Sequence, residues 1–399
     1  MKFIINIVFL IILGITTGHA QTLDEYFREA AENNPGLQSK HKEFEAALQK
    51  IPQVSSLPDP TFSFSYNIPK MMSQSAEFSL MQTFPWFGTL KAQGDAAALM
   101  AEAQYQSFLD ARNQLYYEVS AAYYPLYELN RLREIEQKNI DILESYKSIA
   151  NSKFKNGLAP MVDVLRVDIM LNDAVTNLNI LEKKEKPLKT TFNKLLNRDV
   201  NEEVAIDDSL DAEYLQDSFR RDSLLANNPM LNALDLKVKA SEANEKAAQK
   251  KGLPNLGVGV GYALMESGKN IVMPMLSVSI PIFRKKYKAA EREAQLMQES
   301  YSLQKDEIVN SLTSNYEMTW FQIQQQRELI ELYEEQTLQT NQSLNLLFSA
   351  YSNSGKDFEE VLRMQQQLLQ YEKMKATAEV DYQTALAKLN YITAKHIGK

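Results

Sequence analysis

An internal repeat constrains the fold of this 399-residue chain more than any single motif does. Four short segments of the first half return in the same order in the second half, each 194 to 198 residues later. The matched pairs are residues 33–37 and 227–231, 84–87 and 280–283, 156–157 and 354–355, and 164–166 and 361–363. A fixed order at a nearly constant spacing indicates two copies of one structural unit.

Each copy is expected to contain a helix, a β-hairpin, a long helix and a returning helix. We place the first repeat at 21–197, with a first helix at 22–51 that stops at Pro52, a hairpin at about 61–84, a long helix at about 89–156 and a returning helix at about 160–197. We place the second repeat at 222–399. Its first helix is expected to start near residue 214, within the linker, and is followed by a hairpin at about 256–281, a long helix at about 287–354 and a returning helix at about 356–397. The acidic segment 198–221 between them is predicted to be an equatorial linker.

Both expected hairpins have one apolar face and one face of small residues. Residues 62–66 alternate aromatic side chains with serine, and residues 257–263 alternate glycine or alanine with valine and tyrosine. Alternation with a period of two indicates strands. A second face of Ser, Gly and Ala, rather than of charged residues, is typical of a membrane β-barrel, whose strands need about 9–11 residues.

The expected long helices carry narrow apolar seams instead of one broad apolar face. Leu332, Leu338 and Leu344 lie on such a seam, with Gln, Asn and Thr around them. Polar surface on two sides of a helix is expected where helices surround a water-filled tunnel. A solvated coiled coil would explain the helices equally well, but it would leave the strands unexplained.

The composition excludes most kinds of chemistry. The chain has no Cys, which excludes disulfides, thiolate metal sites and Cys nucleophiles, and its three His are not at metal or triad spacing. No nucleophile with its base and no phosphate loop is recognisable, so we expect no enzyme and no cofactor. The net charge of −8 argues against nucleic acid as a partner.

The first twenty residues have the pattern of a secretory signal peptide. Lys2 precedes an apolar run at residues 3–15, and small residues follow up to Ala20, after which we expect cleavage. The run is shorter than the roughly 20 residues of a membrane-spanning helix. Gln21 rather than Cys follows the expected cleavage site, so no lipid anchor is implied.

These features together resemble the TolC family of outer membrane efflux proteins, and in particular its short heavy-metal-efflux branch. The resemblance rests on the signal peptide, the tandem order of elements and three segments, 84–88, 280–283 and 156–165. It covers essentially the whole mature chain. The order and spacing of the motifs make it specific, although each motif alone is weak.

The resemblance implies a mixed α/β membrane protein, mostly α, that works as a homotrimer. Each subunit would give four strands to one 12-stranded β-barrel in the outer membrane of a Gram-negative-type cell, surrounded by outer membrane lipid, and its helices to a long periplasmic α-helical barrel. Four strands alone would leave sheet edges unpaired in lipid, so closure requires several copies. Trp86, Phe87 and Phe283 would belong to the aromatic girdle on the periplasmic side.

The function implied by the resemblance is that of an exit duct in a tripartite efflux system. The duct would passively conduct substrate to the exterior from a periplasmic adaptor and an inner membrane pump of the RND type. Met265, Met273 and Met275 lie in or near the second hairpin, and their soft thioethers suggest heavy-metal cations as cargo, although methionine also serves as packing. The alternative is a soluble periplasmic coiled-coil adaptor or scaffold.

The resemblance places the gate and the adaptor-docking surface at the two helix–turn–helix tips. The candidate docking residues are Asn156, Gly157, Leu158, Ser354, Gly355 and Lys356, in which glycine permits a tight turn. The candidate gate residues are Asp163, Asp357, Glu360 and Arg363. One acid per subunit would become a ring of three that attracts cations, and Lys356 or Arg363 would pair with these acids to hold the tips shut. The alternative for each residue is an ordinary helix stop or a solvated charge.

Overall fold

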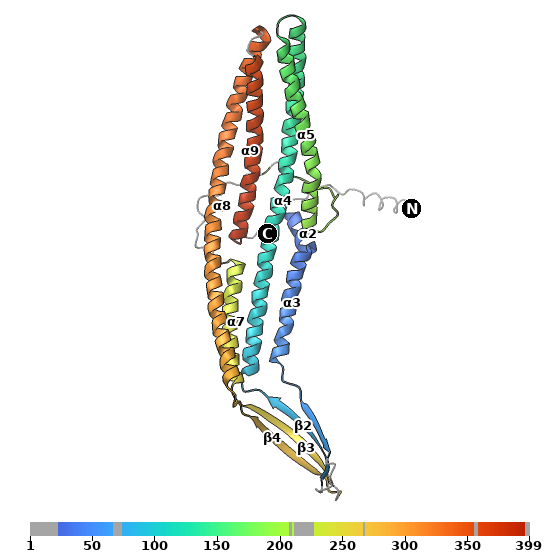
Figure 1. Cartoon of the computed structure of the whole chain (residues 1–399), viewed down its shortest axis with the longest axis vertical. Coiled ribbons are helices and arrows are strands. Elements are labelled where there is room, and N and C mark those ends of the chain that lie inside the picture. The colour runs from blue at the N-terminus through green and yellow to red at the C-terminus, as the bar shows by residue number, and fades with distance from the viewer. Residues whose placement is uncertain are drawn as a thin grey trace, which may run out of the picture. The chain divides into compact units, whose positions relative to one another are not determined.

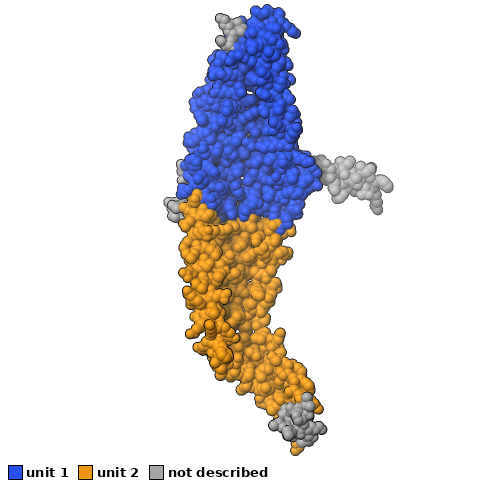
Figure 2. Space-filling model, in the orientation of Figure 1, with its two compact units in different colours: residues 1–35, 113–219, 315–399 blue, residues 36–112, 220–314 orange. Residues whose placement is uncertain are grey.

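The computed structural model describes residues 23–66, 74–206, 210, 227–265, 268–354 and 358–395, and the expected signal peptide lies outside them. The chain forms two compact units, which Figure 2 distinguishes by colour. Unit 1 comprises residues 1–35, 113–219 and 315–399, and unit 2 comprises residues 36–112 and 220–314. Each unit therefore takes segments from both sequence repeats.

Among the described residues most are helical, and their four strands form a sheet (Figure 1) that belongs to unit 2. The first copy contains α2 (Leu23–Asn33), α3 (Pro35–Ser55), β1 (Thr61–Tyr66), β2 (Gln74–Phe84), α4 (Thr89–Lys155) and α5 (Met161–Leu195). The second contains α7 (Pro229–Lys251), β3 (Asn255–Met265), β4 (Ile271–Ser279), α8 (Lys285–Ser354) and α9 (Phe358–Ile392). The expected order of helix, hairpin, long helix and returning helix is confirmed in both copies. None of the helices, as far as they are described, has an apolar stretch sufficient to cross a bilayer.

The repeated Asn-Pro pair marks the start of a helix, whereas we expected it inside one. The segment expected as a single helix at 22–51 is split between α2 and α3 at Asn34, and α3 runs through Pro52 to Ser55. In the second copy, Oδ1 of Asn228 accepts hydrogen bonds from the N–H groups of Met230 (3.0 Å) and Leu231 (3.3 Å). Pro suits the first position of a helix, because an N–H group at that position would have no partner within the helix. The Asn that precedes this Pro caps the N-terminus of the same helix.

The two returning helices end in the same left-handed turn. After α5, Asn197 has φ 55° and the N–H of Arg198 bonds to the carbonyl of Asn193 at 3.1 Å. After α9, Ala394 has φ 47° and the N–H of Lys395 bonds to the carbonyl of Asn390 at 3.1 Å. This hydrogen-bond pattern is a Schellman motif, which satisfies carbonyl groups that a helix end leaves free.

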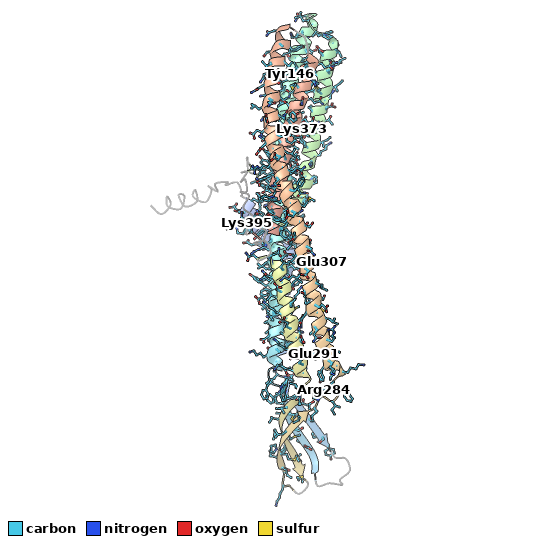
Figure 3. All side chains as sticks on the ribbon, turned by 90° about the vertical axis from the view of Figure 1, so that its left-hand side faces the viewer. Tyr146, Arg284, Glu291, Glu307, Lys373 and Lys395 are labelled. Atoms are coloured by element: carbon cyan, nitrogen blue, oxygen red, sulfur yellow. The ribbon has the colours of Figure 1, made fainter. Side chains whose placement is uncertain are left out.

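The core of unit 1 lies where the end of α4, the start of α5, the end of α8 and the start of α9 pack together. Its buried members include Leu143, Ala150, Val164, Val167, Tyr351, Phe358 and Val361. Tyr146, which is labelled in Figure 3, also belongs to this core, and its ring stacks on that of Phe348 with centroids 5.0 Å apart. Lys373 of α9 forms an ion pair with Glu136 of α4, whose side chain is buried, so polar contacts also join these two helices.

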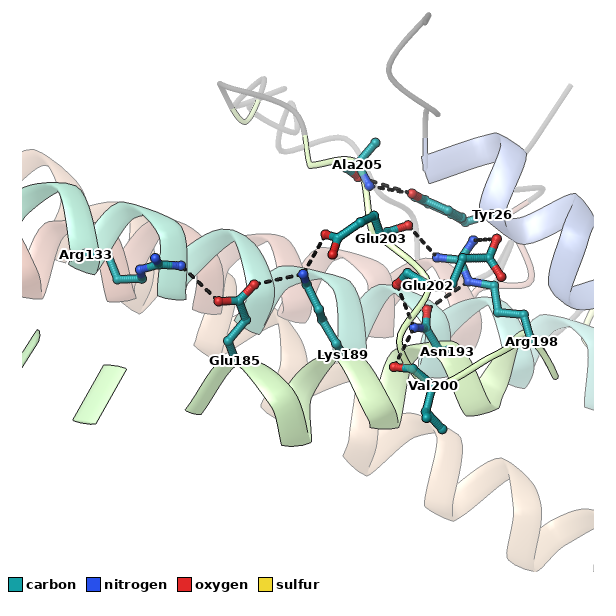
Figure 4. A network of polar contacts seen from close by, with 10 residues as sticks. All are labelled: Tyr26, Arg133, Glu185, Lys189, Asn193, Arg198, Val200, Glu202, Glu203 and Ala205. Carbon is teal, nitrogen blue, oxygen red and sulfur yellow. Dashed lines mark hydrogen bonds and ion pairs between the residues drawn. The ribbon is translucent and has the colours of Figure 1, made fainter. Parts of the chain in front are cut away.

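The first residues of the expected linker form an ordered irregular segment in unit 1 (Figure 4). Asn193 donates from Nδ2 to the carbonyls of Val200 (3.1 Å) and Glu202 (2.9 Å). Arg198 donates from Nε to Oδ1 of Asn193 at 2.8 Å, and its guanidinium lies 5.1 Å from the ring centre of Tyr26. Residues 198–206 are thus attached to α5 and α2, and of the rest of the expected linker only residue 210 is described.

The sheet of unit 2 is antiparallel, in the order β1-β2-β3-β4. Its register gives the two faces opposite characters. One row across the strands is Phe62, Leu80, Val260 and Pro274, and the next row is Thr61, Met81, Gly259 and Met275. Because neighbouring rows point to opposite sides, one face is apolar and the other carries small residues, methionine and hydroxyls, as the alternation predicts.

Candidate functional site

The first helix tip is a tight turn fixed by backbone hydrogen bonds. The N–H of Leu158 bonds to the carbonyl of Lys153 (2.8 Å), and that of Gly157 bonds to the carbonyl of Phe154 (2.9 Å). Gly157 has φ 71°, the left-handed conformation in which glycine avoids the strain of a side chain. Asn156, Gly157 and Leu158 are all exposed, so this candidate docking tip presents an accessible surface.

The second tip is described only at its two ends. α8 ends at Ser354 and α9 begins at Phe358. Gly355, Lys356 and Asp357, which we predicted to belong to the docking tip and the gate, lie outside the described residues, as does the side chain of Ser354. Their roles stay predictions.

Two basic side chains of the first helical hairpin, α4–α5, contact the second helical hairpin, α8–α9. Nζ of Lys153 donates to the last carbonyls of α8, those of Tyr351 (2.9 Å) and Ser352 (3.1 Å). Arg166 of α5 forms an ion pair with Glu359 of α9 at 2.9 Å. A positive charge is favourable at a helix C-terminus, where free carbonyls carry the negative end of the helix dipole. We name these contacts the tip clasp.

The tip clasp was not predicted from the sequence, which suggested Lys356 or Arg363 as the pairing residues. Arg363 instead pairs with Glu360 one turn away on the same helix, with Nε 3.0 Å from Oε2. This contact lowers the pKa of the Glu360 carboxyl. The side chain of Arg363 is 64% exposed and that of Glu360 is 37% exposed, and ion pairs in contact with solvent contribute little to stability.

Asp163 lies in the core of unit 1 and not on the surface of the chain. It occupies the first turn of α5, and only 6% of its surface is exposed. Burial raises the pKa of its carboxyl, the nearby Arg166 opposes that rise, and Glu359 adds to it. The charge of Asp163 in turn helps burial to raise the pKa of Tyr351 to about 12. A gating role for Asp163 stays a prediction, and in this conformation its carboxyl lies near Arg166 of α5 and Glu359 of α9.

The three candidate girdle residues lie just beyond one end of the sheet. Trp86 and Phe87 follow β2, Phe283 follows β4, and the end of β2 pairs with the start of β3, which pairs with the end of β4. Phe87 and Phe283 are 77% and 86% exposed, and the rings of Trp86 and Phe87 meet edge to face at 6.2 Å. Nζ of Lys250 holds the carbonyl of Phe87 at 3.1 Å.

The apolar face of the sheet is exposed along all four strands. Its exposed members are Phe62, Phe64, Tyr66, Leu80, Phe84, Leu256, Val258, Val260, Tyr262, Val272, Leu276 and Val278. Among the described residues, the outer edges of β1 and β4 have no strand partner. A contiguous apolar surface of this kind marks a region that contacts membrane or protein.

Comparison with known proteins identifies a family for the chain. The family model described as "Outer membrane efflux protein" matches residues 27–186 and 221–395. Outer membrane efflux protein BepC of Brucella suis biovar 1 (strain 1330) is 21% identical over 293 residues, which are 67% of this chain and 63% of BepC. The match thus spans less than two thirds of that relative.

Solved structures of outer membrane channels share the fold. The structure of CusC aligns with a TM-score of 0.78 at 15% identity, over 93% of this chain and 91% of CusC. The outer-membrane channel OprN aligns with a TM-score of 0.77 at 16% identity, over 94% of this chain and 90% of OprN.

We predict that Asp163→Asn stabilises the protein at neutral pH. A carboxyl with a raised pKa binds its proton more tightly in the folded state, so its contribution to stability falls as pH rises from about 4 through the folded pKa. Asn removes this loss. Melting temperatures in detergent should show the variant more stable at pH 7, with the difference shrinking towards pH 4. An equal difference at both pH values would contradict this account, and Asp168→Asn, which removes an exposed ion pair with Lys147, is the control.

Proposed function

The chain belongs to the outer membrane efflux protein family, and on that premise we propose that it is the exit duct of a tripartite efflux system. The duct passively conducts substrate to the exterior from an inner membrane pump, of the RND type, and a periplasmic adaptor. Members of the family are outer membrane channels and not enzymes. Family membership also replaces the alternative hypothesis of a soluble periplasmic adaptor.

The observation that carries the proposal is the exposed apolar face of a sheet that is open at both edges. In lipid, a backbone group without a hydrogen-bond partner costs several kcal/mol, so the edges of β1 and β4 must find partners. Pairing β4 of one copy with β1 of the next closes a barrel when three copies supply twelve strands, an even number in the known range. The apolar face then contacts lipid, and the small face lines a water-filled lumen. Trp86, Phe87 and Phe283 form the girdle at the end of the strands.

The helix tips form the gate and the adaptor-docking surface in this proposal. The exposed turn at 156–158 offers backbone and apolar surface to an adaptor, since Leu158 is 65% exposed. The tip clasp holds the helical hairpins α4–α5 and α8–α9 together and stabilises a closed state of the duct. Asp163 acts together with the tip clasp, because its charge interacts with Arg166 and Tyr351. Glu360, Arg363 and Asp357 complete the candidate gate.

Heavy-metal cations are the proposed cargo. Support comes from the net charge of −8, which favours cations over anions, and from the thioethers near the second hairpin. Deletion of the gene is expected to increase the sensitivity of its host to heavy-metal salts but not to hydrophobic drugs. Complementation with the intact gene is the control. The opposite pattern of sensitivity would contradict the metal cargo while leaving the duct intact.

We predict that Leu80→Lys prevents assembly, whereas Ser79→Lys does not. Leu80 lies on the apolar face, where Lys costs about 2–4 kcal/mol at the middle of a bilayer. Ser79 is its neighbour on β2 and points to the opposite face, so it is the matched control. Membrane fractionation followed by mass determination in detergent should find a trimer for the wild type and for Ser79→Lys only. A soluble wild-type monomer, or equal behaviour of the two variants, would refute the barrel.

We predict that removing the tip clasp opens the duct. The double variant Lys153→Ala/Arg166→Ala loses the contacts to Tyr351, Ser352 and Glu359, which should shift the closed-to-open ratio about fivefold or more. Planar-bilayer conductance should therefore rise. Lys155→Ala removes the same charge from an exposed position at the end of α4 and should leave conductance unchanged. Unchanged conductance in the double variant would exclude the clasp as a gate.

A further inference from the structure

Methionine side chains gather above a row of glycines on the small face of the sheet. Gly257, Gly259 and Gly261 of β3 all point to this face. Met81 of β2 and Met275 of β4 lie opposite Gly259 from its two sides. Because β3 has no side chains at these positions, long side chains from both neighbouring strands can lie over its backbone. A water-filled lumen does not itself require this arrangement.

Three side chains converge on one point above Gly261. The position that a β-carbon of Gly261 would occupy lies 3.3 Å from Sδ of Met275, 3.5 Å from Cε of Met273 and 3.5 Å from Oε1 of Glu77. The register agrees with this geometry, since Met273 lies directly opposite Gly261 on β4. Two thioether side chains and one carboxylate therefore share the same small volume.

A third thioether lies one step along the same row. The β-carbon position of Gly259 lies 3.1 Å from Sδ of Met81. The hydroxyl of Ser277 lies 3.6 Å from the same sulfur, within the distance for a hydrogen bond to sulfur. Alternate residues of a strand are about 7 Å apart, so Met81 lies beside the point above Gly261 and within reach of a flexible side chain.

The chemistry of this group selects a soft cation of low charge. Thioether sulfur is a soft, neutral ligand that suits Cu(I), and Ag(I) has the same preference. The carboxylate of Glu77 supplies one negative charge, which offsets the charge of a monovalent ion. Methionine has three rotatable side-chain bonds, so its sulfur can approach an ion without movement of the backbone. Simple packing over glycine would explain the methionines, but it would not place a carboxylate at the same point.

We propose that Met273, Met275 and Glu77, with Met81 beside them, form a binding site for a soft monovalent cation. The site rests on the proposed function in one respect: the small face of the sheet is taken to line the lumen. In that position it lies on the path of the cargo and specifies its class. A site with few ligands also meets the demand of conduction, which requires an ion to bind and then to leave.

The test is a titration of the detergent-extracted, full-length protein with silver nitrate. The methionine methyl groups carry ¹³C and are followed by NMR, with resonances assigned from single Met→Leu variants. The signals of Met273 and Met275 should shift saturably, and that of Met81 should shift to a smaller extent. Met374, an exposed methionine of α9, should not shift, and neither should any of these signals with sodium nitrate. Equal shifts of Met374 and the site methionines would show unspecific binding and overturn the site.

Two variants separate the loss of ligands from the loss of structure. Met273→Leu/Met275→Leu keeps the apolar volume and removes both sulfurs. Loss of a partner outside the ligand shell already weakens metal binding about 10- to 100-fold, so this variant should bind at least about tenfold more weakly. Gly261→Ala places a methyl group at the convergence point and should weaken binding with every sulfur still present. Met374→Leu is the matched control, and wild-type affinity in both site variants would refute the proposal.

Conductance in potassium nitrate, measured on the same preparations, tests the duct separately. Conducting trimers in which silver does not shift the site methionines would refute the site and leave the duct intact. Silver binding at Met273 and Met275 in a protein that does not conduct would refute the duct and leave the site intact. Site variants that still form conducting trimers show that their loss of silver binding is not a loss of fold.

Discussion

The assembly of this protein depends on the backbone N–H and C=O groups that are left unpaired at the two edges of its four-stranded sheet. In the outer membrane, the exposed apolar face of the sheet would contact lipid, and in lipid an open edge is too costly to remain. Assembly of several copies removes the edges, and it also decides what the other face must be. In the proposed duct, the small side chains and glycines on that face line the passage, which a single chain cannot enclose.

Much of the fold could be predicted from periodicity alone. The change between a period of two and a helical pattern located both hairpins and both long helices, because alternation at residues 62–66 and 257–263 has no other simple explanation. The Asn-Pro pairs at 34–35 and 228–229 were recognised as a repeat but were placed inside helices. The pair is itself a sequence signal for a helix start, because Asn caps a helix and Pro suits its first position, but the prediction gave more weight to the helix-favouring residues around it.

The candidate gate was less predictable for a physical reason. Lys153 donates to a carbonyl 198 residues away, and the burial of Asp163 depends on α8 and α9 packing against it. Neither contact can be predicted from the residues next to Lys153 or Asp163 in the sequence. Arg363 illustrates the opposite case, because a partner three residues away on the same helix satisfied it locally. The proposed cation site on the sheet is an intermediate case. Met273 and Met275 could be recognised in the sequence as soft side chains, but only the strand register places Glu77 and Met81 near them.

The matching turns after α5 and α9 show how closely the two copies repeat each other in backbone path. Asn197 tolerates a left-handed backbone, whereas at Ala394 the same conformation costs about 1–2 kcal/mol because of its β-carbon. The hydrogen bonds of the Schellman motif therefore hold the backbone of Ala394 in a conformation that its own side chain disfavours. The two copies thus share the path of the backbone at this turn, although the residue that adopts the left-handed conformation differs between them.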